Sequence, residues 1–379
     1  VSLLQEKKNE KHSNMYRFIF LTMFLFISCK TFYTGSFNQA NLNLIQPDEL
    51  GPIISKSEDG YRTTGESNEF EWWYFDTKLN NGAVFVCYFY KVHFLKDKYF
   101  IGLNYNDDKG EDIFLIKYFN KNEVQFSSDS CNVRMGNNYI VGNLDHYEIK
   151  LDPDDFEGFG VELSLKSNLK PYRPKDGIIK AGDDYFAWLA AVPDGTTKGK
   201  IIIDEINKDV RGDGYHDHNW GNTPLQKLFD GWIWFRGKVE ENTIIASELN
   251  LSDKRGGYNI PILYIANQDS ILTNRFGENG VYTQYTNLIN NLYPKNNEPL
   301  FSSIKVLTED GILVSIKGSK LIDNSEIFKR MNLPSPIRWI MNKNSIDPYY
   351  SRFKSDVKLS KNGNYLGNGF GILEIMDLK

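Results

Sequence analysis

The 379-residue chain lacks several features that mark common protein classes. It has three cysteines, Cys29, Cys87 and Cys131, and no CxxC pair, which excludes a disulfide framework and a structural zinc site of that kind. Its formal net charge is -5 and no strongly basic segment occurs, so nothing predicts a nucleic-acid partner. A GxSxG elbow, a P-loop and a glycine-rich dinucleotide fingerprint are also missing, which leaves the serine-hydrolase, nucleotide and NAD classes without support.

Long apolar runs are scarce, and the one near the N-terminus is short. A positively charged segment precedes the apolar run 18–27, and Ser28 and Cys29 follow that run. A membrane-spanning helix needs roughly 20 apolar residues, so the run instead has the length found in signal peptides. The pattern resembles a bacterial lipoprotein signal over 1–29, with Cys29 as the lipidated residue. It predicts an exported lipoprotein anchored to a membrane of the cell envelope. An uncleaved anchor and an ordinary signal peptide are the alternatives.

Helix-period patterns are rare, whereas aromatic residues make up 14% of the chain. Aromatic residues favour half-buried pleated surfaces, and strand-like runs separated by turn residues recur about every 8–12 residues. We expect strands at 83–94, 99–105, 113–119, 139–144, 147–151, 161–165, 185–192, 231–239, 243–251, 259–266, 303–307, 312–316 and 367–374. The best helix candidate, 325–343, is interrupted by Pro334 and Pro336. The pattern predicts an all-β sandwich or barrel with a short helical segment in its second half.

The chain is too long for one ordinary core, since domains usually run about 100–200 residues. Residues 30–65 are rich in polar and turn-forming residues and are predicted to form a linker. We expect an N-terminal domain over 66–225 and a C-terminal domain over 226–379.

The stretch 212–221, Gly-Asp-Gly-Tyr-His-Asp-His-Asn-Trp-Gly, concentrates the residues suited to chemistry. In an extended strand, alternate side chains share a face. This gives two sets: Tyr215, Asp217 and Asn219 on one face, and His216, His218 and Trp220 on the other.

Asp217 is the natural proton carrier of the first set. A carboxyl group in an aromatic pocket is desolvated, so its pKa rises and it can act as a general acid. Tyr215 can steer the proton, and Asn219 can hold Asp217 or the substrate. The alternative is a structural polar knot where strands of two barrels meet.

The second set is expected to be structural. His216 and His218 fit hydrogen-bonded buried histidines, and Trp220 a packing residue. A His-x-His pair can bind a metal, but no third-ligand pattern accompanies it, so no metal is expected.

A second constellation, Glu71-Trp72-Trp73-Tyr74, has the same alternation. We expect Trp72 and Tyr74 to pack in the core, and Glu71 or Trp73 to line a cavity and contact substrate. Trp188 and the pair Trp232 and Trp234 have the same two interpretations.

These motifs resemble the AttH/hydroxyneurosporene synthase family, which includes the carotenoid 1,2-hydratases and is similar to fungal Diels–Alderase-type cyclases. The resemblance covers residues 66–379. It is carried by four segments: Glu71-Trp-Trp-Tyr-Phe75, Tyr185-Phe-Ala-Trp188, Gly212 to Gly221, and Trp232-x-Trp234.

The resemblance implies two tandem lipocalin-like (calycin) barrels. It also implies protonation of a terminal isoprenoid double bond followed by capture of the cation by water, with no metal or organic cofactor. Asp217 is then the acid, with Tyr215 beside it. Family hydratases use a His-x-Trp pair, in which Trp188 matches the Trp while Phe186 replaces the His.

We therefore expect a cofactor-free hydratase, lyase or isomerase acting on an isoprenoid or lipid, in its most specific form a hydro-lyase of the carotenoid 1,2-hydratase type. The alternative is a non-catalytic carrier lipoprotein, since a lipocalin-like barrel can hold one apolar ligand. A purely structural surface protein is a third possibility, and it predicts no enclosed cavity near Asp217.

Overall fold

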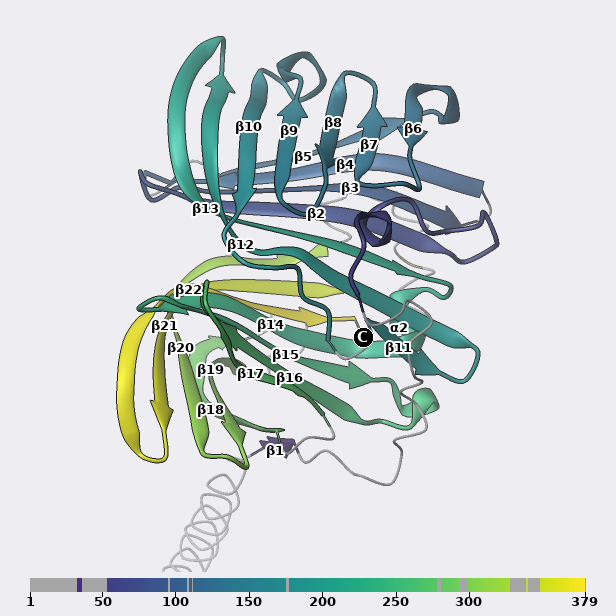
Figure 1. The fold of residues 1–379 in the computed structure, drawn as a ribbon. Coiled ribbons are helices and arrows are strands. Elements are labelled where there is room, and N and C mark those ends of the chain that lie inside the picture. The colour runs from purple at the N-terminus through teal and green to yellow at the C-terminus, as the bar shows by residue number, and fades with distance from the viewer. Residues whose placement is uncertain are drawn as a thin grey trace, which may run out of the picture.

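The computed structural model describes residues 33–35, 53–94, 96–107, 109–110, 112–174, 177–277, 281–292, 299–327, 339 and 348–378. Two antiparallel sheets contain all the named strands of this part of the chain, and each sheet curls into a nearly closed barrel. The two barrels are stacked, with the first sheet above the second in Figure 1. The all-β, two-barrel fold class predicted from the sequence is confirmed.

The first barrel is a twelve-stranded sheet with the order β5-β4-β3-β2-β13-β12-β10-β9-β8-β7-β6, and β11 pairs with β12 off this path. Its strands are β2 (Phe70–Leu79), β3 (Val84–Phe94), β4 (Lys96–Asn106), β5 (Asp112–Phe119), β6 (Val124–Phe126), β7 (Asn132–Met135), β8 (Asn138–Gly142), β9 (His146–Leu151), β10 (Phe159–Ser167), β11 (Ile178–Ala181), β12 (Asp184–Ile203) and β13 (Ile206–Gly221). Short 3-10 helices precede β2, β6 and β10, namely η3 (Lys56–Asp59), η4 (Lys121–Glu123) and η5 (Pro153–Asp155).

The second barrel is a ten-stranded sheet with the order β1-β18-β19-β20-β21-β22-β14-β15-β16-β17. Its strands are β1 (Tyr33–Gly35), β14 (Phe229–Val239), β15 (Asn242–Leu251), β16 (Asn259–Ala266), β17 (Ile271–Phe276), β18 (Val281–Leu292), β19 (Pro299–Thr308), β20 (Ile312–Glu326), β21 (Tyr349–Lys361) and β22 (Asn364–Asp377). The one-turn helix α2 (Leu225–Leu228) joins the two sheets, and η6 (Asp253–Arg255) follows β15. Residues 222–228 connect the two sheets, and the predicted domain boundary between 225 and 226 lies in this connection.

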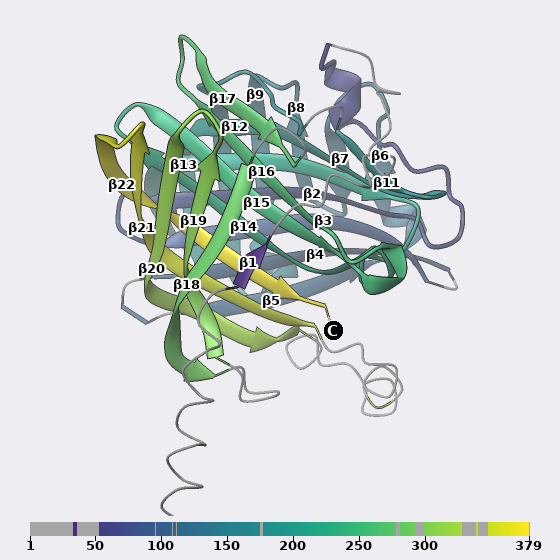
Figure 2. The ribbon, with the colours of Figure 1, turned by 90° about the horizontal axis from the view of Figure 1, so that it is seen from below.

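The strands pack around three apolar clusters, two inside the barrels and one between them. The cluster inside the first barrel contains Trp73 and Phe75, and that inside the second contains Phe235 and Phe353. The third cluster joins residues of both sheets, including Trp188 and Trp234, and packs the outer face of one barrel against the other. Figure 2 shows β14, β15 and β16 crossing the region of β2, β3 and β4. The cluster between the two barrels is therefore formed by residues from both halves of the chain.

Several sequence predictions fall outside the described residues or need correction. The signal segment 1–29 with Cys29 lies outside them, as does most of the helix candidate 325–343, whose first two residues belong to β20. No helix of the described part is long and apolar enough to cross a membrane. Residues 56–65 were expected to belong to a linker, but Asp59 and Thr63 are buried against the first barrel. This polar segment can be buried because its carboxylate and carbonyl oxygens make hydrogen bonds with side chains of the first barrel.

Candidate active site

β13 presents the 212–221 motif with two chemically different faces. It pairs with β2 on one side and β12 on the other, so that Asp217 lies opposite Tyr74, and Asn219 lies between Trp72 and Trp188. The Asp217 face looks toward the second barrel, whereas the alternate side chains point into the first. Gly214 is required for the close packing of these strands, because a Cβ there would lie 2.3 Å from the Thr197 hydroxyl.

Asp217 is the centre of a small hydrogen-bonded cluster. Its Oδ2 accepts from the Tyr215 hydroxyl at 2.8 Å and from the Trp188 indole nitrogen at 3.2 Å. Its Oδ1 accepts from the Asn219 amide at 2.7 Å. The same indole nitrogen lies 3.3 Å from the Tyr215 oxygen. The structure thus brings together four residues that the sequence singled out, with Trp188 as a direct donor to the carboxyl.

Burial makes this carboxyl a weak acid. Asp217 is only 8% exposed, and desolvation raises its pKa from 3.8 to about 7. The Tyr215 hydrogen bond, the nearby His216 charge and the bonds from Asn219 and Trp188 oppose this shift without cancelling it. A carboxyl that is half protonated near neutrality is suited to general acid catalysis.

The second barrel completes the surroundings of Tyr215. The Trp234 ring lies 5.2 Å from the Tyr215 ring, and the Arg236 guanidinium lies 5.3 Å from its centroid. Arg236 forms a buried ion pair with Asp76, which stands opposite Tyr215 on β2. Neither Arg236 nor Asp76 was predicted, because the two residues are 160 positions apart and no local motif marks them.

On the other face of β13, two histidines contact the segment that precedes β2. His216 Nδ1 lies 2.7 Å from the Tyr74 carbonyl, and its Nε2 lies 3.2 Å from both carboxylate oxygens of Asp59. His218 has the same arrangement, at 2.8 Å from the Glu58 carbonyl and 2.8 Å from Glu71 Oε1.

These contacts indicate a charged histidine. A carbonyl oxygen can only accept, so His216 Nδ1 carries a proton, and a carboxylate facing Nε2 calls for a second proton there. Burial lowers the pKa of His216, but the Asp59 charge and hydrogen bonds outweigh it and the net shift is upward. His216 and Asp59 therefore form a buried imidazolium–carboxylate pair.

Glu71 and Trp73 do not share the surface of Asp217, which corrects the expectation that they line its cavity. Glu71 is fully buried and accepts hydrogen bonds from the Thr63 hydroxyl and the backbone of 62–63. Trp73 stacks on His218 with ring centroids 4.6 Å apart. Trp72 and Tyr74 face the second barrel instead. Alternation along β2 was predicted correctly, but which face is internal depends on the partner sheet.

Phe186, by contrast, lies on the Asp217 face. Its ring is 6.2 Å from Trp72 and meets Phe229 of the second barrel edge-on at 5.5 Å. The position at which family hydratases have a histidine is here part of an aromatic wall.

Among the described residues, one group has side chains of metal-ligating type close together. Asp59, Cys131 and His216 are all buried, with ligand atoms within 4.8 Å of one another. The Asp59 carboxylate is engaged by His216 and by the Tyr147 hydroxyl, and burial raises the pKa of the Cys131 thiol. Hydrogen bonds thus account for this group, which the sequence did not predict because its members are far apart in the chain.

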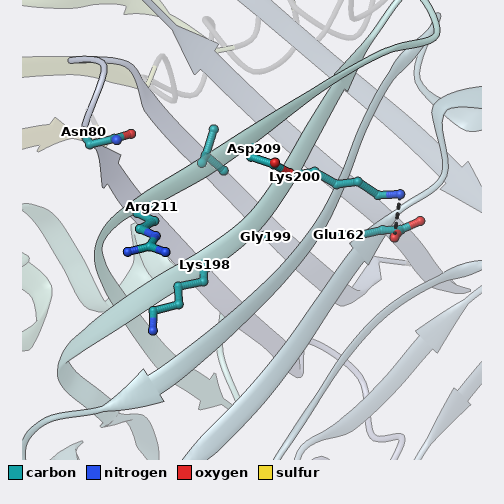
Figure 3. A pocket seen from close by; sticks show the side chains of 8 residues that line it. Asn80, Glu162, Lys198, Gly199, Lys200, Asp209 and Arg211 are labelled. Carbon is teal, nitrogen blue, oxygen red and sulfur yellow. Dashed lines mark ion pairs between the residues drawn. The ribbon is translucent and has the colours of Figure 1, made fainter.

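Two hollows of the surface lie in the described part of the chain at a distance from Asp217. One, of about 530 Å³, lies over β10, β12 and β13, where Lys200 pairs with Glu162 at 3.0 Å (Figure 3). The other, of about 620 Å³, lies near the turn between β3 and β4. Charged side chains dominate the lining of the first hollow, whereas charged and aromatic side chains share the lining of the second. The chemical properties of Asp217 follow from its hydrogen bonds and its raised pKa.

The protein thus has two stacked antiparallel barrels with a buried, hydrogen-bonded carboxyl between them. Known proteins were compared with it in sequence and in structure. No family model matches the chain. In sequence it is 26% identical over 206 residues to the hydroxyneurosporene dehydrogenase of Chlorobaculum tepidum, a match covering 44% of this chain and 53% of that protein. It is 27% identical over 135 residues to the quinolone epoxide rearrangement protein asqO of Emericella nidulans, covering 32% of this chain and 37% of that protein. The matched region thus spans about half or less of these curated relatives.

Solved structures share the fold over most of the chain. An AttH protein of Nitrosomonas europaea superposes with a TM-score of 0.62 at 14% identity, covering 88% of this chain and all of that one. CghA gives a TM-score of 0.59 at 12% identity, covering 88% of this chain and 98% of that one. Kievitone hydratase of Nectria haematococca gives 0.55 at 13% identity, covering 92% and 98%. These comparisons confirm the resemblance to the AttH/hydroxyneurosporene synthase family and its lipocalin-like fold.

Proposed function

We propose that the protein is an enzyme that protonates a carbon–carbon double bond of a hydrophobic substrate, with Asp217 as the general acid. The observation that carries this proposal is the buried Asp217 carboxyl, which has a pKa of about 7 and is held by three side-chain donors. The names of the relatives agree with chemistry on unsaturated or oxygenated hydrophobic molecules, since one structural neighbour is a hydratase.

In the proposed reaction the Asp217 proton forms a C–H bond with the π electrons of the alkene. The adjacent carbon becomes a cation, which the faces of Trp188, Trp234 and Tyr74 can stabilise. Water adds to this cation and returns one proton to the Asp217 carboxylate, so the acid is regenerated and no redox change occurs. The Tyr215 hydroxyl can both donate and accept, and it lies where it can pass the proton to or from Oδ2. Loss of a proton from a different carbon would give isomerisation instead of hydration.

The specific form of this chemistry, cofactor-free hydration of the carotenoid 1,2-hydratase type, is the sharper proposal. Phe186 argues for a different substrate or mode of protonation, because it supplies an aromatic face where family hydratases have a titratable ring. The competing function is a hydrophobic-ligand carrier, and Phe186 favours it for the same reason.

The test is turnover of neurosporene and kievitone by the wild-type protein beside Asp217→Asn in D2O. Hydration adds one water to the product mass and places deuterium on the protonated carbon. We expect labelled product from the wild type and a loss of at least about a hundredfold in the variant, the usual lower range for a general acid. Binding of either compound without conversion, equal in both proteins, would establish the carrier instead.

For localisation we propose an exported lipoprotein tethered through Cys29. Two features of the sequence support it, the short apolar run 18–27 and the cysteine that follows Ser28. Incorporation of labelled palmitate by the wild type, and its loss in Cys29→Ser, is the expected result. Equal labelling of both proteins would contradict the assignment.

A further inference from the structure

The face of the first barrel that carries Asp217 changes from aromatic to charged along the strands. Directly paired residues of an antiparallel sheet share a face, so the register sorts this surface into rows. The row through Asn219 continues across Trp72, Tyr90 and Phe100. Their rings stack at centroid distances of 5.3 and 4.9 Å.

Two residues further along each strand, the row through Asp217 continues across Tyr74 and Tyr88. Tyr74 is half-buried, and burial holds the pKa of its phenol well above the usual range. Two residues further again, the row through Tyr215 contains Asp76 and Asn104. The acid therefore lies between an aromatic row and a polar row.

Arginines of the second barrel cover the polar row. Arg236 of β14 pairs with Asp76, and Arg352 of β21 donates to Asn104 Oδ1 at 3.2 Å and to Glu374 Oε1 at 3.0 Å. Each arginine thus has a carboxylate partner, Asp76 for Arg236 and Glu374 for Arg352, and the charges of Asp194 and Asp323 also act on Arg236 and Arg352, respectively.

Arg236 has unused hydrogen-bonding capacity. Its side chain is more than nine-tenths buried, and its Nε has no hydrogen-bond partner among the described residues. A buried donor without an acceptor destabilises the folded protein, so a native site usually supplies one. Because Asp76 already balances the charge, the acceptor that suits this nitrogen is a neutral oxygen.

We propose that Arg236 is the head-group site for an amphipathic substrate whose neutral oxygen, a carbonyl above all, binds at the polar row. The apolar part of the molecule lies along Trp72, Tyr90 and Phe100, and the double bond to be protonated lies between them at Asp217. This inference rests on the proposed function, because it names the substrate class of the same site. A bare hydrocarbon would leave Arg236 without its acceptor.

Binding separates this inference from catalysis. The probes are farnesene, a hydrocarbon, and farnesal, which carries an aldehyde on the same skeleton, each measured by displacement of fluorescent diphenylhexatriene. We expect wild-type protein to bind farnesal about tenfold or more tightly than farnesene, the value of one hydrogen bond from a charged donor. Asp217→Asn should keep this preference even though it removes turnover, so failure of the acid mechanism and failure of the head-group site have different signatures.

The variants test the two rows independently. Arg236→Met alone would strand the Asp76 carboxylate, so it is combined with Asp76→Asn. The double variant should bind farnesene as the wild type does and lose its preference for farnesal, whereas Arg236→Lys should retain part of it. Trp72→Ala should weaken both probes equally. Arg275, which pairs with Asp310 at 3.2 Å on the surface of the second barrel, gives the matched control Arg275→Met.

Three results would overturn the proposal. They are equal affinity of the wild type for the two probes, a preference for farnesal that survives in the double variant, and no binding of either probe by the wild type. Thermal unfolding of each variant verifies that a lost preference is not lost folding.

Discussion

At Asp217, the burial that creates a useful acid also lowers the stability of the fold. The folded pKa of about 7 exceeds the ordinary value of 3.8, so between these pH values the folded protein binds more protons than the unfolded one. Stability therefore falls as pH rises from about 4 to 7, and the cost is then constant. Asp217→Asn removes that cost.

We expect Asp217→Asn to raise the melting temperature at pH 8 by more than at pH 4, with a difference of several degrees. A shift of about three pKa units corresponds to a few kcal/mol, and each kcal/mol is worth roughly 2–4 °C in a chain of this size class. Differential scanning fluorimetry at the two pH values measures this. The exposed Asp213→Asn is the matched control on the same strand. An equal effect at both pH values would mean that folding does not raise the pKa of Asp217.

The donors to Asp217 also define its titration. Trp188→Phe removes a hydrogen bond that favours the carboxylate, so the pKa of Asp217 should rise further, by about one unit at most. The carboxyl ¹³C resonance of labelled protein, followed from pH 5 to 9, reports the midpoint. Trp220→Phe, on the opposite face of β13, should leave it unchanged. A midpoint near 4 in the wild type would remove the physical basis of the acid role.

Much of this residue-scale picture could be predicted from the sequence. Alternation in one strand is a local property, and it separated Tyr215, Asp217 and Asn219 correctly from the histidines. The partners of those histidines could not be found in the same way. Asp59 lies 157 positions before His216 in a segment without strand periodicity, and nothing local marks it as buried.

At the scale of elements, residues 53–65, which include η3, are held against the first barrel by the histidines of β13. We call this segment the clasp. Burial opposes the charge of His216, but Asp59 raises its pKa above 6.5 in the folded protein. A pair of this kind contributes its full stability below the unfolded pKa and loses it as pH rises through the raised folded value. The clasp should therefore weaken in alkaline solution.

Hydrogen exchange of residues 53–65 tests this prediction. We expect protection of the segment at pH 6 and faster local opening, relative to β9, at pH 9 after correction for the intrinsic rate. Asp59→Asn should open the segment even at pH 6, because removing one partner of a buried pair costs about 3–5 kcal/mol. Asp129→Asn, at an exposed turn, is the control. Unchanged protection between pH 6 and pH 9 would contradict a titration of the His216–Asp59 pair within this range.

Strand positions were the most predictable elements, because hydrophobic runs and turn residues are both local signals. The run 83–94 corresponds to β3, and 259–266 matches β16. The strands β6, β7, β11, β17, β18 and β21 were missed. In β21, for example, Ser351 and Ser355 lie on the buried face and interrupt the apolar alternation that would mark a strand. The face of β2 that points inward could not be predicted either, because it depends on where the second barrel packs.

At the scale of the whole molecule, the acid site belongs to neither barrel alone. The carboxyl and its donors come from the first sheet, whereas Trp234 and Arg236 cover Tyr215 from the second. Desolvation by burial is the largest cause of the raised pKa of Asp217. Because the second barrel covers the partner of this carboxyl, we expect part of the pKa shift to depend on the tandem arrangement.

Trp234→Ala tests this dependence on the second barrel. Removing the indole admits water beside Tyr215, so the pKa of Asp217 should move down toward 3.8, even though no group that hydrogen-bonds the carboxyl has changed. Loss of a buried Trp should also destabilise the protein by about 3–5 kcal/mol. Phe353→Ala inside the second barrel is the control, because it destabilises the fold without opening the interface. If both variants left the Asp217 midpoint near 7, the acid would be a property of β13 and its neighbours, and the second barrel would serve only to bind substrate.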